Sequence, residues 1–342
     1  MNFVKPLLNW YEANRRDLPW RRTRDPYAIW VSEIMLQQTR VAAVIPYYLR
    51  FLEELPDVHA LSTVDEDRLL KLWQGLGYYS RAKNLKRAAI EIEERYSGQF
   101  PDTYRELLKL SGIGPYTAGA IASIAFGERV PAVDGNALRV FLRLWDADWD
   151  VSKAETRERV TERLIKDLPK EAGTFNQAVM ELGATVCVPN GAPLCDRCPW
   201  SELCLAKKNG TIGERPVRSP KKQRIEEAYT VFVLEQGERF LIRKRTETGL
   251  LSGLFELPNR SGHLVSMSPD GKPDLTEAVS VLEELGVTPA GAWSVYRRRH
   301  IFTHRTWQMQ VVRVSVTGEA PEGYLYYDGT QSVPTAFAVC LP

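Results

Sequence analysis

The sequence predicts a multidomain protein in which an all-α domain is followed by an α+β domain. Apolar residues recur at helical spacing through residues 1–206, in segments separated by Pro, Gly, Asp and Ser. From residue 227 to residue 342 the pattern changes to the alternating segments that are typical of strands. Residues 207–226 lie between the two patterns and are rich in basic residues, Pro and Gly, which is typical of an exposed interdomain linker.

The individual elements follow from the same two patterns, helical spacing in the first domain and strand alternation in the second. In the first domain we expect helices at residues 28–38, 41–55, 66–76, 81–96, 103–110, 116–126, 135–145 and 174–187. In the second domain we expect strands at residues 228–236, 239–245 and 306–316, and a helix at 274–286.

Composition limits the classes of protein without choosing one. The chain has 342 residues and a formal net charge of +2, so its bulk charge argues neither for nor against a nucleic-acid partner. No apolar run reaches the roughly 18 residues that a membrane span needs, and the N-terminal segment lacks the cleavage site of a signal peptide. We therefore expect no membrane partner and a location in the cytosol, where disulfides are rare.

Four of the five cysteines lie within eighteen residues and point to a metal site. Cys187, Cys195, Cys198 and Cys204 have the spacing C-x7-C-x2-C-x5-C, with Pro and Gly between them. Structural zinc usually takes two short C-x2-C pairs, and only one such pair is present here. Four thiolates on short loops also suit an iron–sulfur cluster, so spacing leaves both metals open. Cys340 lies apart from this cluster, and we expect it to be buried.

A Gly-Ile-Gly turn joins two expected helices. Gly112 and Gly114 allow a tight turn, and the next helix begins at once, so its free N–H groups form an anion site suited to a DNA phosphate. An ordinary helix–helix turn would have the same pattern. Asp134 precedes another helix, where an Asp is an N-cap by default.

Five motifs together carry a family resemblance. They are LPWRRTRDPYAIWVSEIMLQQTRV at 18–41, WQGLGYYSRAKNL at 73–85, LSGIGPYTAGAI at 110–121, VDGNALRV at 133–140, and the four cysteines. With these motifs the chain resembles the helix–hairpin–helix DNA glycosylase superfamily, and within it the adenine DNA glycosylases. The resemblance extends from about residue 3 to residue 206 and continues more thinly through the C-terminal domain.

The resemblance implies a fold, a reaction and a cofactor. It implies a six-helix barrel at about residues 23–130 and a part that holds a 4Fe–4S cluster, built from residues 1–22 and 131–206. It also implies removal of adenine mispaired with 8-oxoguanine or guanine, by a monomer that acts on double-stranded DNA in the bacterial cytosol and nucleoid. One departure concerns the first two cysteines, which are separated by seven residues here and usually by six in the family.

Two carboxyl groups suit this chemistry, because glycosidic hydrolysis commonly needs an acid and an anion. Glu33 lies among large apolar residues, so burial should raise its pKa and let it act as general acid and later as base. Asp134, beside helix N–H groups, should stay ionised and stabilise the oxocarbenium-like sugar. Asn136 would orient either carboxylate. Without the resemblance, a solvated helix position for Glu33 and an N-cap role for Asp134 remain the alternatives.

Tyr116 differs from the corresponding residue of glycosylases that also nick the strand. Relatives of that kind resemble GVGRKTA at this place, and their Lys forms a Schiff base with the sugar. A phenol cannot do so, so this sequence predicts a monofunctional glycosylase that leaves an abasic site.

The resemblance also implies a set of recognition residues, because the target base must leave the helix stack before it can react. Gln38 and Tyr78 would wedge the duplex, and Thr39 and Leu76 would contact the 8-oxoguanine side. The adenine pocket would be lined by Arg16, Trp20, Arg21, Leu36 and Gln177. Gln177 replaces a Glu that contacts adenine in several relatives, and it cannot ionise.

The C-terminal domain resembles a NUDIX-like fold without its catalytic helix. A NUDIX hydrolase needs a metal-binding helix dense in Glu, and this chain offers only Glu283 and Glu284 there. The basic stretch 297–307 is expected as a loop before a strand, suited to a phosphate backbone and a base edge. The family's 8-oxoguanine reader is Phe-Ser-His, and this chain has Phe302, Thr303 and His304.

Three other functions remain possible on the sequence alone. The same scaffold serves thymine and uracil mismatch glycosylases, and Gln177 favours that alternative slightly. The chain could also be a lesion-binding protein without catalysis, against which Glu33 and Asp134 both argue. A NUDIX-type nucleotide hydrolase is the least supported, for want of its metal-binding helix.

Overall fold

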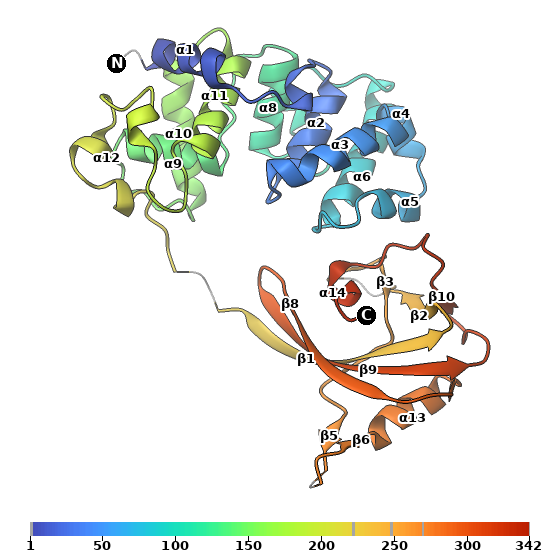
Figure 1. Ribbon diagram of the computed structural model, residues 1–342. Coiled ribbons are helices and arrows are strands. Elements are labelled where there is room, and N and C mark those ends of the chain that lie inside the picture. The colour runs from blue at the N-terminus through green and yellow to red at the C-terminus, as the bar shows by residue number, and fades with distance from the viewer. Residues whose placement is uncertain (1–2, 221–222, 247–248, 269, 342) are drawn as a thin grey trace. The chain divides into compact units, whose positions relative to one another are not determined.

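The computed structural model describes residues 3–220, 223–246, 249–268 and 270–341. Its contacts divide the chain into two compact units (Figure 1). The first unit contains Met1–Val64 and Lys83–Pro220, and the second contains Asp65–Ala82 and Lys221–Pro342. The expected all-α domain followed by an α+β domain is confirmed. Among the described residues, no helix has both the length and the apolar character that a membrane crossing requires.

The first unit is built from helices joined by short turns. Its α-helices are α1 (Val4–Asn14), α2 (Pro26–Leu36), α3 (Val41–Glu54), α4 (Val58–Thr63), α6 (Ser80–Tyr96, whose first turn belongs to the second unit), α7 (Tyr104–Leu107), α8 (Pro115–Ala125), α9 (Gly135–Leu144), α10 (Ala154–Asp167), α11 (Ala172–Thr185) and α12 (Leu205–Lys208). Short 3₁₀ turns lie at η1 (Pro19–Arg21), η2 (Cys195–Arg197) and η3 (Ile212–Glu214).

Helices α2 and α8 pack against each other in the interior of this unit. Both begin with Pro at the first position, where the missing N–H costs nothing. Asp25 also caps α2 by accepting a hydrogen bond from the Tyr27 N–H. In α2 every residue from Tyr27 to Met35 is buried, and in α8 small residues allow a close approach. A Cβ added at Gly119 would lie 2.4 Å from the Pro131 carbonyl oxygen, so only Gly fits there.

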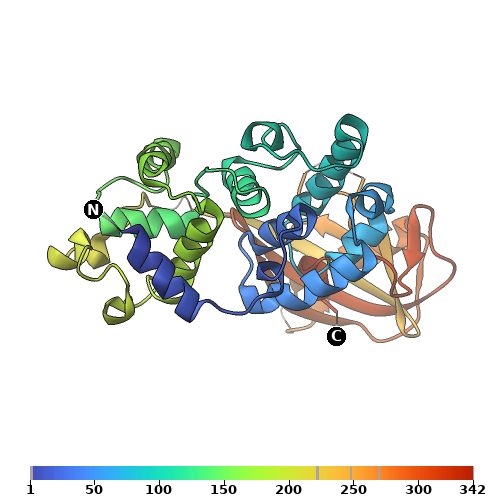
Figure 2. The same ribbon diagram turned by 90° about the horizontal axis from the view of Figure 1, so that it is seen from above.

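A second core forms where α1, α9 and α11 meet (Figure 2). Phe3, Phe141, Phe175 and Trp200 pack their rings together, with the Phe3 and Trp200 centroids 5.6 Å apart. The Trp200 indole N–H donates to the Phe3 carbonyl at 2.7 Å. This core joins the N-terminal helix to the segment that carries the four cysteines.

Part of the expected linker folds against the first unit. Asp146 accepts hydrogen bonds from Thr211 at 2.6 Å and from Asn209 at 2.8 Å. Residues 205–208 form α12, and Val217 pairs with Asp150 in an isolated β-bridge. The basic composition indicated solvent exposure but could not reveal these anchors. Two residues of the expected linker, 221 and 222, lie outside the described residues.

The second unit is a mixed sheet with a helix on each face (Figure 1). Its central strands β1 and β9 run parallel from the pair Ile225–Arg305 to the pair Glu235–Ser315. Alternate side chains of β1 serve opposite faces: Val231 and Val233 pack with Phe337 of α14, whereas Phe232 and Leu234 pack near α13. The elements are α5 (Glu66–Leu72), β1 (Ile225–Gln236), β2 (Arg239–Lys244), β3 (Phe255–Glu256), β4 (Asn259–Ser261), β5 (Ser266–Met267), β6 (Pro273–Asp274), α13 (Thr276–Glu284), β7 (Thr288–Pro289), β8 (Ser294–Ile301), β9 (Arg305–Thr317), β10 (Tyr324–Tyr326) and α14 (Thr335–Ala338).

The basic stretch 297–307 differs from its expected form. Residues 294–301 form strand β8, which pairs antiparallel with β9 from Ser294–Arg313 to Ile301–Thr306. Only residues 302–304 form the turn of this hairpin. The expectation of a loop was wrong for 297–301. The residues Arg297–His300 are all polar and show no apolar alternation, so the sequence lacks a strand signal where pairing with β9 forms a strand.

Candidate active site

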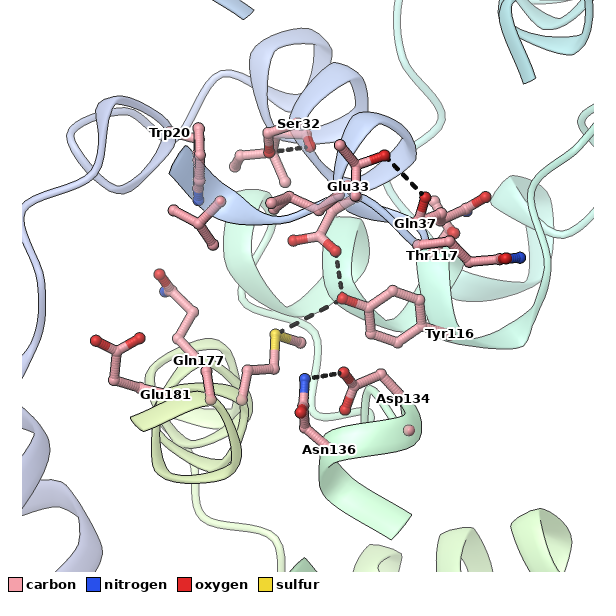
Figure 3. Close-up of a pocket in the computed structure, with 18 of the residues that line it drawn as sticks. Trp20, Ser32, Glu33, Gln37, Tyr116, Thr117, Asp134, Asn136, Gln177 and Glu181 are labelled. Carbon is pink, nitrogen blue, oxygen red and sulfur yellow. Dashed lines mark hydrogen bonds between the residues drawn. The ribbon is translucent and has the colours of Figure 1, made fainter. Parts of the chain in front are cut away.

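A cavity of about 840 Å³ opens in the first unit and gathers residues from distant parts of the chain. Its walls come from η1, α2, the Gly-Ile-Gly turn with α8, the start of α9, and α11 (Figure 3). The sequence-predicted residues among its lining are Arg16, Trp20, Arg21, Glu33, Leu36, Gln38, Thr39, Gly112, Gly114, Tyr116, Asp134, Asn136 and Gln177. The fold therefore brings the candidate catalytic and adenine-pocket residues to one cavity.

Glu33 is a buried carboxyl group on the wall formed by α2. Its side chain is 6% exposed, and burial raises its pKa to about 7. The Tyr116 hydroxyl donates a hydrogen bond to Glu33 Oε2, which lowers that pKa, and the nearby Asp134 raises it (Figure 3). A carboxyl group in this environment holds a proton near neutral pH, as a general acid must.

The Gly-Ile-Gly turn places Tyr116 at the start of α8. Gly112 has a positive φ of 73°, and a Cβ there would lie 2.7 Å from the Asn84 Cβ, so Gly is required. Gly114 is the N-cap of α8 and offers no side-chain cap. Gly112 and Gly114 are both exposed and both line the cavity. The arrangement leaves backbone N–H groups free for an anion at this rim.

Asp134 combines the N-cap role with a place in the cavity. Its Oδ1 accepts from the Ala137 N–H at 2.7 Å, and its Oδ2 accepts from Asn136 Nδ2 at 2.7 Å. Arg139 Nη2 donates to Asn136 Oδ1 at 2.7 Å, and Arg139 Nε donates to the Cys187 carbonyl at 2.7 Å. These bonds fix the Asp134 carboxylate and join its support to the cysteine segment.

Glu181 is a residue of this site that sequence reasoning missed. It lies on α11, four residues after Gln177, and it is fully buried in the cavity wall (Figure 3). Arg16 binds it through Nε and Nη2, both at 2.8 Å, and Arg21 Nη2 binds it at 2.7 Å. Burial opposes ionisation, but hydrogen bonds from both arginines lower the pKa of Glu181 to about 2. The helical spacing from Gln177 was the available signal, since residues four apart share a face.

The pairing with Glu181 determines what the two arginines can do. Glu181 offsets one of their two positive charges, which reduces the extent to which they oppose protonation of Glu33. Gln177 lies on the same wall, and its Oε1 accepts a 3.4 Å hydrogen bond from the Tyr11 hydroxyl. These groups give the pocket donors and acceptors for the edge of a base.

Gln38 has an unusual backbone where the chain leaves α2. It is exposed and has a positive φ of 59°. Tyr78, the other expected wedge residue, belongs to the second unit and has a positive φ of 47°. Left-handed backbone at residues other than Gly costs energy and concentrates at functional sites.

Within the second unit, Tyr78 lies next to one of the residues expected to contact 8-oxoguanine. The Tyr78 hydroxyl and Thr303 Oγ1 lie 2.5 Å apart. Thr303 and His304 are exposed at the tip of the β8–β9 hairpin, whereas Phe302 packs its ring 4.9 Å from that of Trp307. Leu76, in contrast, is buried. The structure thus groups Tyr78 with Thr303, and it leaves His304 available to a ligand.

The four clustered cysteines line a common cavity beside α9 and α11. Within the described residues, no three His, Cys, Asp or Glu side chains are arranged to hold a single metal ion. Burial raises the pKa of Cys198 and Cys204, so coordination to metal ions would be needed to hold them as thiolates. Arg143 and Lys207 line the same cavity, and Arg143 Nη1 donates to Cys187 Sγ at 3.4 Å. This donor set fits an anionic iron–sulfur cluster held by Cys187, Cys195, Cys198 and Cys204.

Comparisons with known proteins agree with this site. The family model "HhH-GPD superfamily base excision DNA repair protein" matches residues 31–166, and a NUDIX domain model matches residues 230–339. The structure of a thermostable thymine-DNA glycosylase superposes with a TM-score of 0.56 at 29% identity, covering 60% of this chain and 95% of that chain. The fold and the cavity thus define a base-excision DNA repair glycosylase with a C-terminal NUDIX-like domain.

The family within that class follows from two relatives of which this chain covers more than two thirds. The human adenine DNA glycosylase is 34% identical over 381 residues, which cover 93% of this chain and 68% of the human protein. The adenine DNA glycosylase of Buchnera aphidicola subsp. Schizaphis graminum is 36% identical over 259 residues, which cover 75% of this chain and 74% of that protein. This chain belongs to the adenine DNA glycosylase family.

Proposed function

We propose that this chain is a monofunctional glycosylase that removes adenine mispaired with 8-oxoguanine or guanine and leaves an abasic site. The observation that carries the proposal is the buried Glu33, whose pKa of about 7 lies far above that of an ordinary carboxyl group. It shares its cavity with Asp134, whose oxygens are fixed by Asn136 and by the start of α9. One carboxyl group that keeps its proton and one fixed nearby suit acid-assisted hydrolysis of an N-glycosidic bond.

In this mechanism Glu33 donates its proton to a ring nitrogen of the extruded adenine. The bond between the base and C1′ of the sugar then breaks, the electron pair leaves with the base, and the sugar becomes oxocarbenium-like. Asp134 stabilises that cation electrostatically. Glu33, now ionised, accepts a proton from the water that adds to C1′, which restores the acid and completes the abasic site.

Tyr116 supports a glycosylase without strand cleavage. It occupies the position at the start of α8 where a Lys would have to stand to form a Schiff base with the sugar, and its hydroxyl is engaged with Glu33. The pKa of Tyr116 lies well above its usual range because of burial and the neighbouring carboxylates, so it remains a hydrogen-bond donor. We therefore assign it to the positioning of Glu33.

Base recognition is assigned to cavity residues around Glu33. Gln177 would contact the edge of the base, and Trp20 and Leu36 would pack against its ring, since all three line the cavity. Arg16 and Arg21 would complete the pocket through Glu181. Gln38 and Tyr78 would occupy the space that the extruded base leaves, and Phe302, Thr303 and His304 would read 8-oxoguanine. For the alternative function, removal of thymine, the same pocket would have to accept the edge of a pyrimidine at Gln177.

Cys187, Cys195, Cys198 and Cys204 would hold a 4Fe–4S cluster, which would give structural support to the segment that follows α11. The C-terminal domain is assigned to lesion recognition without hydrolysis. Glu283 and Glu284 of α13 are exposed, and Glu284 pairs with Arg260 at 3.0 Å. We also propose that the chain acts as a monomer on double-stranded DNA in the cytosol and nucleoid.

A panel of duplexes tests the proposed function. Single-turnover reactions use A opposite 8-oxoguanine, A opposite G, A opposite T, and T opposite 8-oxoguanine, with the released base measured directly and the strand examined with and without alkali. We expect free adenine from the first two duplexes only, and strand breaks only after alkali. Release of thymine, or breaks without alkali, would contradict the proposal.

A further inference from the structure

Arg218 lies at the rim of the active-site cavity, although it comes from the segment expected to be a linker. It is exposed, and it lines the same cavity as Asp134 and Asn136. The sequence indicated only an exposed interdomain linker here and gave this segment no place in the site. The cavity wall distinguishes Arg218 from the segment's other cations, because no other Lys or Arg of residues 207–220 lines it.

The chain on both sides of Arg218 is fixed to the first unit. The Val151 N–H donates to the Val217 carbonyl at 3.0 Å. The Ser219 N–H donates to Asp150 Oδ1 at 3.3 Å, and the Ser219 hydroxyl donates to the other oxygen of that carboxylate. Arg143 Nε holds the Arg215 carbonyl at 2.9 Å. These hydrogen bonds fix the backbone on both sides of Arg218 and so keep its side chain at the cavity rim. A linker that only connects two domains does not need them.

Asp134 contributes one carboxylate to this cavity, and the guanidinium groups of Arg157 and Arg218 together outweigh it and favour an anion. Arg157 of α10 lines the cavity as well, and its guanidinium donates to the carbonyl of Val133, the residue before Asp134. Within the described residues, no carboxylate is paired with Arg157 or Arg218, in contrast to Arg16 and Arg21, which share Glu181. Guanidinium groups that line a cavity without a carboxylate partner suit the binding of a phosphate.

We propose that Arg218, which lines the same cavity as Arg157, binds a phosphodiester of the DNA strand that flanks the extruded nucleotide. The inference rests on the proposed function, which places the sugar of that nucleotide next to Asp134. The two phosphates attached to this sugar are a few bonds from C1′, so one of them reaches the rim when C1′ faces the carboxylate. Arg218 then holds the backbone while the base occupies the deeper wall, and it contributes position rather than base specificity.

Binding measurements with the full-length, cluster-containing chain test this assignment. The probe is a duplex with 2′-fluoro-2′-deoxyadenosine opposite 8-oxoguanine, because fluorine at C2′ disfavours the cationic sugar and prevents excision. We compare Arg218→Gln, Arg218→Lys and the matched control Lys208→Gln, which removes another exposed cation of the same segment that does not line the cavity. The dissociation constant is measured as a function of salt concentration.

We expect Arg218→Gln to bind about three- to tenfold more weakly, and its salt dependence to fall by about 0.9 in the log–log slope, the amount for one phosphate contact. Arg218→Lys should retain most of the affinity, and Lys208→Gln should match the wild type. Each of the two linkages that flank the fluoroadenosine is then replaced in turn by a neutral methylphosphonate. At the linkage that Arg218 contacts, this replacement should abolish the difference in affinity between Arg218→Gln and the wild type.

Two results would overturn the assignment. One is equal affinity and equal salt slope for Arg218→Gln and the wild type. The other is a deficit in Arg218→Gln that persists with each flanking linkage neutralised in turn. Adenine excision by the wild type is followed in the same preparation. Absence of excision would remove the proposed function, whereas normal excision with either result above would remove only the role of Arg218.

Discussion

The Tyr116 hydroxyl donates a hydrogen bond to Glu33 Oε2 inside the cavity. This bond favours the ionised form of Glu33, whereas burial of the carboxyl group disfavours that form and raises its pKa to about 7. The pKa of Glu33 is therefore set by two opposed effects, of which burial is the larger. Each effect can be removed separately, which makes the pH dependence of excision informative.

Tyr116→Phe should shift the pH profile of excision upward. Excision needs protonated Glu33, so the single-turnover rate should fall about tenfold per pH unit above the pKa of this group. Without the Tyr116 hydrogen bond the pKa of Glu33 rises further, and the fall should begin at higher pH. Tyr96→Phe is the matched control, because it removes a Tyr–Glu hydrogen bond of 2.9 Å to Glu106 that lies outside the cavity. A profile for Tyr116→Phe that falls at the wild-type pH or below it would contradict this role.

Glu181→Gln should destabilise the protein by about 3 kcal/mol, because it leaves Arg16 and Arg21 without their buried anion. Glu158→Gln, an exposed carboxylate of α10, is the control. The pKa of Glu181 is lowered to about 2 in the folded chain. Its contribution is therefore present above the ordinary carboxyl pKa and is lost as pH falls toward 2. In chemical denaturation, the stability difference between the wild type and Glu181→Gln should shrink from pH 5 downward, and a difference that grows would exclude the ion pair as its cause.

Cys198→Ser should reduce bound iron, whereas Cys340→Ser should not. Cys198 lines the cavity shared by the clustered cysteines, and Cys340 is buried in the other unit beside Met309. Metal analysis of the wild type should give about four irons per chain and no zinc. Zinc in the purified wild type, or full iron in Cys198→Ser, would contradict the cluster assignment.

His304→Ala should weaken discrimination between 8-oxoguanine and guanine opposite adenine. One lost base contact costs about 1–3 kcal/mol, so the ratio of affinities for the two duplexes should fall at least about fivefold. His263→Ala is the control, since this exposed imidazole of the same unit bonds to the Gln308 carbonyl at 3.1 Å. If both variants keep the wild-type ratio, the lesion is read elsewhere.

The sequence predicted the helical unit well, because its helices carry strong apolar periodicity and clear start signals. Asp134 precedes the start of α9 as expected, and α2 spans Pro26–Leu36 where a helix at 28–38 was expected. The sequence-predicted catalytic residues share one cavity because α2 and α8 pack directly and α9 follows shortly after. Their chemical roles are predictions that the measurements above address.

Other features could not be obtained from the sequence, because they depend on long-range contacts. Glu181 appeared as an ordinary helix residue, and only the packing of α11 against the N-terminal segment pairs it with Arg16 and Arg21. The place of Arg218 depends on the anchors at Asp150 and Val151. Likewise, composition could not indicate that Asp65–Ala82 clusters with the C-terminal residues, where Lys71 Nζ donates to the Gln331 carbonyl at 3.1 Å.

The most direct test of the central claim is the effect of Glu33→Gln on excision and on binding, measured with A opposite 8-oxoguanine at neutral pH. The amide keeps the size of the side chain but has no acidic proton to donate. We predict a loss of at least about a hundredfold in the single-turnover rate, with affinity for the uncleavable fluoroadenosine duplex within a few-fold of the wild type. Excision at the wild-type rate, or a loss of affinity equal to the loss of rate, would contradict the assignment of Glu33 as the acid.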